Sequence, residues 1–268
     1  MFYQEIPLHL EGSLPEAKLV VYIQEYSEGL YVKERPLVLL CPGGGYTYTS
    51  DREAESIALQ FLAMGCHAAV LRYSPAPAVY PIQLKELAYS MKYIRAHAAE
   101  WHINQDKIVV QGCSAGGHLA ASLGVFWKEE WLGDAVDASP EEIKPNGLIL
   151  CYPVITSGEF AHRGSFDNLT GGDDSLLEKL SLEKQVNAHT PKTFLWHTFT
   201  DGSVPMENSL LFVSALRKYN IPTEFHLYPE GRHGLALANE LTAGEDGGHI
   251  QKECTSWVEL AHTWLKNI

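Results

Sequence analysis

Two glycines flank Ser114 in a pattern that suits nucleophilic chemistry. The segment Gly112-Cys113-Ser114-Ala115-Gly116 follows the apolar run Ile108–Gln111 and precedes a helical pattern from Leu119 to Phe126. A serine in a tight strand-to-helix turn projects its hydroxyl beyond the sheet, and flanking glycines allow so sharp a turn. The alternative is a glycine-rich turn whose serine only caps the helix. The strand–turn–helix context favours Ser114 as a nucleophile.

A second glycine-rich turn, residues 42–45, follows the apolar run Leu37–Cys41. Backbone amides of such a turn can hold the negative oxygen that forms when a nucleophile attacks a carbonyl, together with the amide after the nucleophile. We expect this oxyanion hole to comprise Gly44, Gly45 and Ala115. A phosphate-binding loop is the rival interpretation, but there is no G-x-G-x-x-G pattern and no Walker lysine. A plain flexible turn is the other alternative.

A nucleophilic serine needs a histidine to take its proton and a carboxylate to orient that histidine. Asp201 follows the apolar run that ends at His197, and His233 follows the run that ends at Tyr228. Ligands gather where parallel strands end, so both groups are candidates. Asp201 could instead cap the helix that Pro205 opens, and His233 could be an ordinary loop histidine. Three further carboxylates are fallback acids: Asp173, Asp174 and Glu178.

The strands that must position these groups are short runs, several of them apolar at every position. Such runs are typical of strands covered on both faces, and their alternation with helical patterns predicts an α/β fold with a mostly parallel central sheet and helices on both faces. With no linker or repeat, residues 1–268 are expected to form one domain. The predicted strands are Leu19–Ile23, Leu37–Cys41, Ala68–Arg72, Ile108–Gln111, Gly147–Cys151, Thr193–His197 and Thr223–Tyr228.

Helix signals separate these runs. Ser50 to Glu53 has the spacing of a capping box, in which the serine and the glutamate side chains bond each other's backbone amides, and it predicts a helix that ends before Gly65. Pro81 and Pro205 each open a further helical pattern, and a last one runs from about 249 to 266. The stretch 153–191 breaks the rhythm, with only a helical piece near 176–186, and is predicted to be a small cap over the site.

Aromatic residues crowd the predicted edge of the site, where they could stack on a sugar or enclose a small acyl group. We expect substrate contacts from Tyr46, Trp196 and Phe199, while packing in the core is the competing role for each. Other aromatic residues near this edge or in the cap are Tyr48, Tyr152, Phe160 and Phe166.

Composition limits the partners. A formal net charge of −13 argues against nucleic acid, which needs a basic face. The five cysteines form no C-x-x-C pair and are expected to be buried thiols, and no histidine pair has metal-ligand spacing. The first residues lack a signal-peptide pattern and no apolar stretch is long enough to span a bilayer, so we expect a cytoplasmic protein without membrane association. The sequence does not decide between a monomer and a homo-oligomer.

Taken together, these motifs resemble the acetyl and feruloyl esterase (acetylxylan-esterase-like) branch of the α/β-hydrolases, which is related to the hormone-sensitive lipases. The resemblance implies the α/β-hydrolase fold, a catalytic triad of Ser114, Asp201 and His233, no cofactor, and hydrolysis of short-chain acyl esters, with acetylated sugars as candidates. Pro42 stands where hormone-sensitive-lipase relatives usually carry histidine, which favours the carbohydrate-esterase side. The matching segments are residues 42–46, 50–53, 70–73, 112–120, 201–205 and 231–234.

Two other classes of function compete with a serine esterase. The same groups could hydrolyse an amide, as in small peptidases or formamidases. A hydrolase-like fold can also serve as a non-catalytic binding protein, but that reading predicts a broken triad, and all three positions are intact in this sequence.

Overall fold

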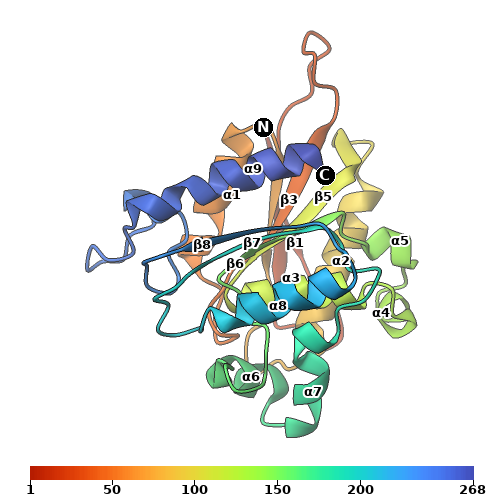
Figure 1. The fold of residues 1–268 in the computed structure, drawn as a ribbon. Helices are drawn as coiled ribbons and strands as arrows, with labels where there is room; N and C mark the ends of the chain where they lie inside the picture. Colours follow the sequence, from red (N-terminus) through yellow and green to blue (C-terminus); the bar gives the residue numbers. More distant parts are fainter.

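An eight-stranded sheet runs through the computed structural model, which describes all residues 1–268 (Figure 1). The strand order is β1-β2-β4-β3-β5-β6-β7-β8, in which the β1–β2 and β2–β4 pairs are antiparallel and every other pair is parallel. The strands are β1 (Phe2–Pro7), β2 (Lys18–Ile23), β3 (Arg35–Cys41), β4 (His67–Arg72), β5 (Ile103–Cys113), β6 (Gly147–Cys151), β7 (Thr193–Thr198) and β8 (Thr223–Tyr228).

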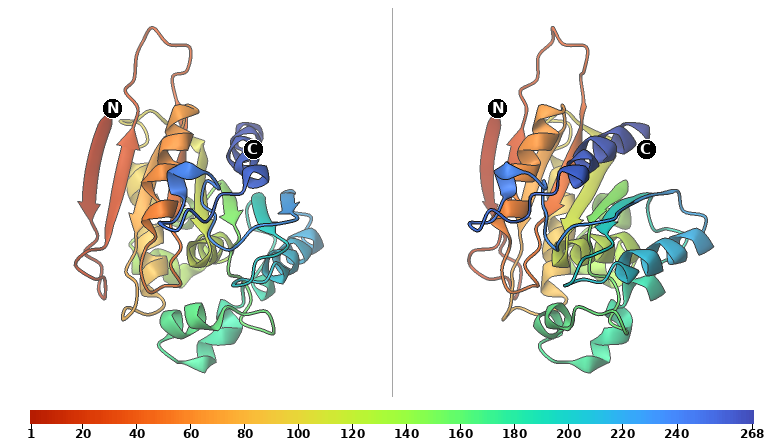
Figure 2. Two further views of the ribbon diagram at one scale, coloured as in Figure 1. Left: turned by 90° about the vertical axis from the view of Figure 1, so that its left-hand side faces the viewer. Right: turned by 60° about the vertical axis from the view of Figure 1, so that its left-hand side comes forward.

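Helices cover both faces of this sheet (Figure 2). The α-helices are α1 (Glu55–Ala63), α2 (Ile82–Ala96), α3 (Ala115–Phe126), α4 (Glu130–Ala135), α5 (Pro140–Ile143), α6 (Arg163–Thr170), α7 (Leu177–Leu180), α8 (Glu207–Lys218) and α9 (Trp257–Asn267). The 3₁₀ helices are η1 (Asp51–Glu53), η2 (Asp174–Leu176), η3 (Leu182–Lys184), η4 (Glu240–Thr242) and η5 (Lys252–Ser256). None of these helices is long and apolar enough to cross a bilayer.

Strand side chains alternate between two hydrophobic clusters, one on each face of the sheet. In β3, Leu37 and Leu39 join the cluster beneath α2, α3 and α8, whereas Val38 and Leu40 join the cluster beneath α1 and α9. Because both faces are buried, such strands are apolar at every position, which is the signal that the sequence carries. All seven strands expected from the sequence are confirmed, and all five cysteines are buried free thiols, as expected.

The sequence did not predict β1, because this edge strand pairs with one neighbour and only Ile6 in it is buried. The capping box at Ser50 is wrong: the serine side chain caps nothing, and the buried Glu53 instead binds a distant turn. Two helices begin later than expected, α8 at Glu207 and α9 at Trp257.

Residues 153–191 contain the unpredicted helix α6 as well as η2, α7 and η3. Figures 1 and 2 show α6 and α7 together at one end of the molecule. The segment contacts the glycine-rich turn after β3, because the amide of Asn168 donates to the Gly45 carbonyl at 2.9 Å.

Candidate active site

Ser114 lies in a strained turn between β5 and α3. Its backbone has φ 55° and ψ −120°, a left-handed conformation that side-chain-bearing residues avoid unless the surroundings enforce it. Its amide is held by the Cys151 carbonyl at 3.0 Å. A Cβ at Gly112 would come within 2.1 Å of the Gly116 carbonyl oxygen, and one at Gly116 within 2.0 Å of the Cys41 oxygen. Only glycine fits at these two positions, so the turn requires the pattern that the sequence shows.

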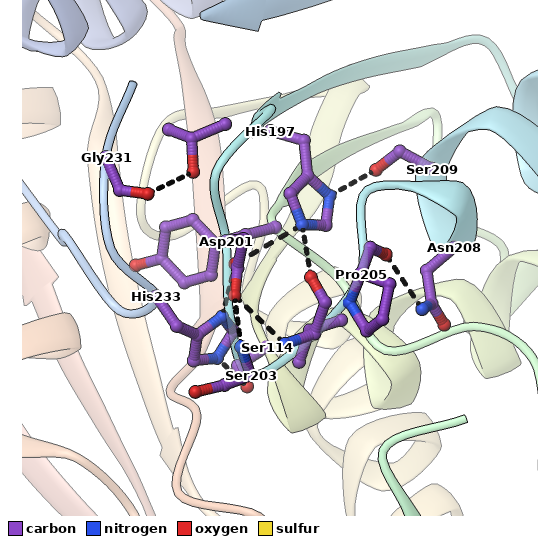
Figure 3. Close-up of polar contacts among 12 residues, drawn as sticks. Ser114, His197, Asp201, Ser203, Pro205, Asn208, Ser209, Gly231 and His233 are labelled. Atoms are coloured by element: carbon purple, nitrogen blue, oxygen red, sulfur yellow. Dashed lines mark hydrogen bonds and ion pairs between the residues drawn. The ribbon is translucent and has the colours of Figure 1, made fainter. Parts of the chain in front are cut away.

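The structure brings Ser114, His233 and Asp201 together in one chain of hydrogen bonds, drawn in Figure 3. The Ser114 hydroxyl and His233 Nε2 are 2.7 Å apart, and His233 Nδ1 is 2.7 Å from Asp201 Oδ2. With the Nδ1 proton donated to the carboxylate, Nε2 is free to accept the serine proton. Ser114 is 7% exposed and Asp201 8%, so the chain is mostly shielded from water.

Asp201 is surrounded by donors. Its Oδ1 accepts from the amides of Ser203 and Val204, each at 2.9 Å, and its Oδ2 also lies 3.3 Å from Nε2 of the fully buried His197. Burial alone would raise the pKa of this carboxyl, but the hydrogen bonds from His197 and His233 outweigh it and hold the pKa well below its usual range. Asp201 is therefore a charged carboxylate at neutral pH.

His197 is a second histidine on that carboxylate. Its Nε2 donates to the Val204 carbonyl at 2.9 Å, and its Nδ1 accepts from the Ser209 hydroxyl at 2.8 Å (Figure 3). Both ring nitrogens are thus satisfied in the neutral form, with the proton on the side that faces Asp201. No local pattern predicts this role, because His197 lies inside a buried strand.

The glycine-rich turn after β3 presents amides beside Ser114. Neither Gly44 nor Gly45 donates its amide within the protein, and both residues line the same cavity as Ser114. Ala115 opens α3, so its amide has no helical partner either. The glycine-rich turn packs closely on the strained turn at Ser114, since a Cβ at Gly43 would lie 3.0 Å from that of Ser114.

A buried carboxylate anchors this turn. Glu53 Oε2 accepts from the Gly43 amide at 2.8 Å, and Oε1 accepts from the Tyr152 hydroxyl at 2.7 Å. That hydroxyl in turn accepts from the Ala236 amide at 2.9 Å. The Tyr152 ring packs edge-on against His233, with ring centroids 5.1 Å apart. Glu53 therefore links the glycine-rich turn, the tyrosine after β6 and the loop that carries the histidine.

An open cavity of about 710 Å³ surrounds the serine and the histidine. Tyr48 is the only apolar side chain in its lining. The residues that line it are Gly44, Gly45, Tyr48, Ser50, Arg52, Glu53, Ser114, His162, Thr200, Gly202, Ser203, Arg232, His233, Gly234 and His249.

The structure does not place the three predicted substrate-binding aromatics in this cavity. Tyr46 is buried, and its hydroxyl bonds Nδ1 of His118 at 2.9 Å. Trp196 points from β7 into the core, where it stacks on Trp257 with centroids 5.5 Å apart. Phe199 is exposed but does not line the cavity. Burial in the core contradicts substrate contacts from Tyr46 and Trp196, whereas a contact from Phe199 stays a prediction.

The cavity holds polar residues that the sequence did not single out. His162 reaches it from the segment before α6, and burial together with the charge of His233 lowers its pKa. Arg52, Arg232 and His249 line its other parts. The fallback acids Asp173, Asp174 and Glu178 are exposed and lie outside it. No cluster of three or more histidine, cysteine or acidic side chains is arranged to hold a metal ion.

The fold and the strained serine turn define an α/β-hydrolase. The BD-FAE family model matches residues 22–216, more than half of the chain, so the chain belongs to that family.

Among solved structures, the chain is similar to an acetyl ester-xyloside bifunctional hydrolase of Caldicellulosiruptor lactoaceticus, with a TM-score of 0.80 and 36% identity over 94% of this chain and 88% of that one. It is also similar to a carboxylesterase of Lactobacillus plantarum, with a TM-score of 0.86 and 29% identity over 100% of this chain and 98% of that one.

A curated relative, endo-1,4-beta-xylanase B of Butyrivibrio fibrisolvens, is 38% identical over 85% of this chain. An acetylxylan esterase of Xylanibacter ruminicola is 29% identical over 83% of it. The chain spans 37% and 44% of these two relatives, less than half of each.

Proposed function

We propose that this protein is a serine carboxylic ester hydrolase that removes short acyl groups, such as acetyl, from sugars. The observation that carries the proposal is the hydrogen-bonded chain from Ser114 through His233 to Asp201, with both distances at 2.7 Å and the serine open to a cavity. The similarity to an acetylxylan esterase and to a carboxylesterase supports the same class of reaction.

In this mechanism the Ser114 oxygen attacks the ester carbonyl carbon while His233 Nε2 takes the serine proton. The amides of Ala115 and of Gly44 or Gly45 stabilise the oxygen that becomes negative. When the carbonyl reforms, the carbon–oxygen bond to the alcohol breaks and the alcohol leaves with the proton from His233. Water then attacks the acyl-serine with His233 again as base, which releases the acid and the free serine.

The cavity lining favours a small acyl group and a polar alcohol. A long acyl chain gains free energy only by burying its methylenes against apolar surface, at about 0.8 kcal/mol for each CH₂. Tyr48 offers the only such side chain in the cavity. A sugar, by contrast, can exchange its water hydrogen bonds for those of the polar lining.

The test compares p-nitrophenyl acetate, butyrate and octanoate, with the matching anilide as an amide probe. We expect kcat/KM to be highest on acetate, to fall with chain length, and to be lost in Ser114→Ala. Ser27→Ala, in an exposed loop away from the cavity, serves as the matched control and should behave as the wild type. Wild-type activity on the anilide alone, or full activity of Ser114→Ala, would contradict the proposal.

A further inference from the structure

One part of the cavity is cationic although the chain as a whole carries a net charge of −13. Arg52, Arg232 and His249 line it together. Arg232 and His249 lie against the same turn, in which the Gly244 amide donates to the Gly248 carbonyl at 3.0 Å. A Cβ at Gly248 would be 2.5 Å from Arg232 Nη1, and one at Gly244 would be 3.3 Å from His249 Nδ1. The charges of the two guanidinium groups in one cavity oppose each other, so they favour a compensating anionic group.

Two nitrogen atoms in this part of the cavity have no partner. Arg52 Nε donates to the Thr242 carbonyl at 2.7 Å, which fixes the guanidinium, but its Nη2 is buried without a hydrogen bond. His249 Nδ1 is likewise buried and unpaired. Native proteins satisfy nearly all buried polar atoms, so the unpaired Nη2 leaves Arg52 with a hydrogen bond still to donate at the wall of the cavity.

None of the nearby carboxylates accepts a hydrogen bond from Arg52 or His249. Both oxygens of Glu53 are occupied by the Gly43 amide and the Tyr152 hydroxyl, and Asp201 is taken up by its own donors. Asp246 reaches Arg232 only at 3.4 Å, and both side chains are more than half exposed, so water screens that pair.

We propose that this cluster, formed by Arg52, Arg232 and His249, binds a carboxylate on the alcohol part of the substrate, so that the enzyme prefers acyl esters of acidic sugars. The inference rests on the proposed ester hydrolysis at Ser114. The carboxylate is assigned to the alcohol because the lining suits a short acyl group, which leaves the rest of the 710 Å³ to the sugar. Guanidinium groups bind carboxylates in two-pronged, charge-assisted hydrogen bonds.

The test uses two substrates that differ only in the charged group: a monoacetylated methyl glucuronide and the methyl glucoside acetylated at the same hydroxyl. We expect kcat/KM to be at least about tenfold higher for the glucuronide, mostly through a lower KM. Arg52→Gln should bring this ratio close to one, and Arg52→Lys should restore part of it. Arg217→Gln removes an exposed arginine outside the cavity and should leave the ratio unchanged.

A binding measurement separates this inference from the proposed activity. Methyl glucuronide should bind Ser114→Ala at least about tenfold more tightly than methyl glucoside by calorimetry, and Arg52→Gln in the same background should abolish the difference. Equal binding of the two sugars, or a kcat/KM ratio of one in the wild type, overturns the acidic-sugar preference while hydrolysis of p-nitrophenyl acetate still supports an esterase. Failure to hydrolyse any ester, with selective glucuronide binding retained, would count against the activity and not against the cluster.

Discussion

Replacing Glu53 by glutamine tests whether a buried carboxylate holds the glycine-rich turn after β3 in place. Glu53 accepts two hydrogen bonds, from the Gly43 amide and from the Tyr152 hydroxyl. Glutamine has one carbonyl oxygen and one NH₂ group, so in either orientation its NH₂ faces a group that is itself donating. The Tyr152 hydroxyl already accepts from the Ala236 amide, and if it also accepted from the glutamine NH₂, its own proton would lose the acceptor that Glu53 provides. Glu53→Gln therefore breaks one buried bond and leaves a donor unpaired.

The magnitude follows from the kind of bond. A hydrogen bond to a charged group contributes about 1.5–3 kcal/mol, so the variant should lose about 2 kcal/mol of unfolding free energy. For a chain of this size that corresponds to a fall in Tm of roughly 4–8 °C. Complete loss of one oxyanion donor costs on the order of 10²–10³ in rate, and a turn that is displaced while keeping its amides should cost about tenfold in kcat.

The assay pairs thermal unfolding with p-nitrophenyl acetate kinetics below the Tm of every variant. Glu55→Gln is the matched control, because Glu55 is an exposed glutamate two residues further along the chain. It should show wild-type Tm and kcat. A Glu53→Gln protein with wild-type Tm and kcat would refute the assigned role, and a fall in Tm without a fall in kcat would limit Glu53 to stability.

Three further predictions concern the histidines and the acid. Asp201→Asn should lower kcat by about 10⁴ while substrate still binds, because the amide no longer holds His233 with its proton on Nδ1; a loss below about tenfold would contradict this. His197→Asn removes a donor from Asp201 and should lower kcat about tenfold. It should also move the acidic limb of the kcat/KM profile to higher pH, which a loss of stability alone would not do. Burial lowers the pKa of both His67 and His118 to about 4. Between pH 6.5 and pH 4, these two histidines therefore bind protons in the unfolded chain but stay neutral in the folded protein. The unfolding free energy should therefore be highest above pH 6.5 and fall by up to about 3 kcal/mol per histidine towards pH 4 in urea titrations, with a smaller fall in His67→Gln; a flat profile would contradict it.

The sequence predicted those parts of the molecule whose structure depends on residues close together in the chain. The buried parallel strands are apolar on both faces, and the turn at Ser114 needs glycine at positions 112 and 116 for steric reasons, so both are visible in the sequence. The strand ends also indicated Asp201 and His233. β1 carried too little signal, since an edge strand with a single buried residue reads as a polar segment.

The errors arose where a distant contact decides what a side chain does. Glu53 has the spacing of a helix cap, but its partners are Gly43 and Tyr152, the second of which is 99 positions away. Trp196 is near Asp201 in sequence, yet strand alternation turns it, together with Phe194, towards α9 and away from the cavity. The cationic part of the cavity joins residues from η1 and from loops near the C-terminal end, which no sequence window brings together.

Direct detection of an acyl-enzyme tests whether Ser114 is the nucleophile. Wild-type protein is mixed with p-nitrophenyl acetate, quenched in acid within the first turnovers, digested, and examined by mass spectrometry, with Ser114→Ala treated in parallel. We expect an added acetyl group on the wild-type peptide that contains Ser114. It should be absent from the variant and should disappear from the wild type once the substrate is exhausted. Turnover with an unmodified Ser114 peptide, or an acetyl group that persists on another residue, would contradict it.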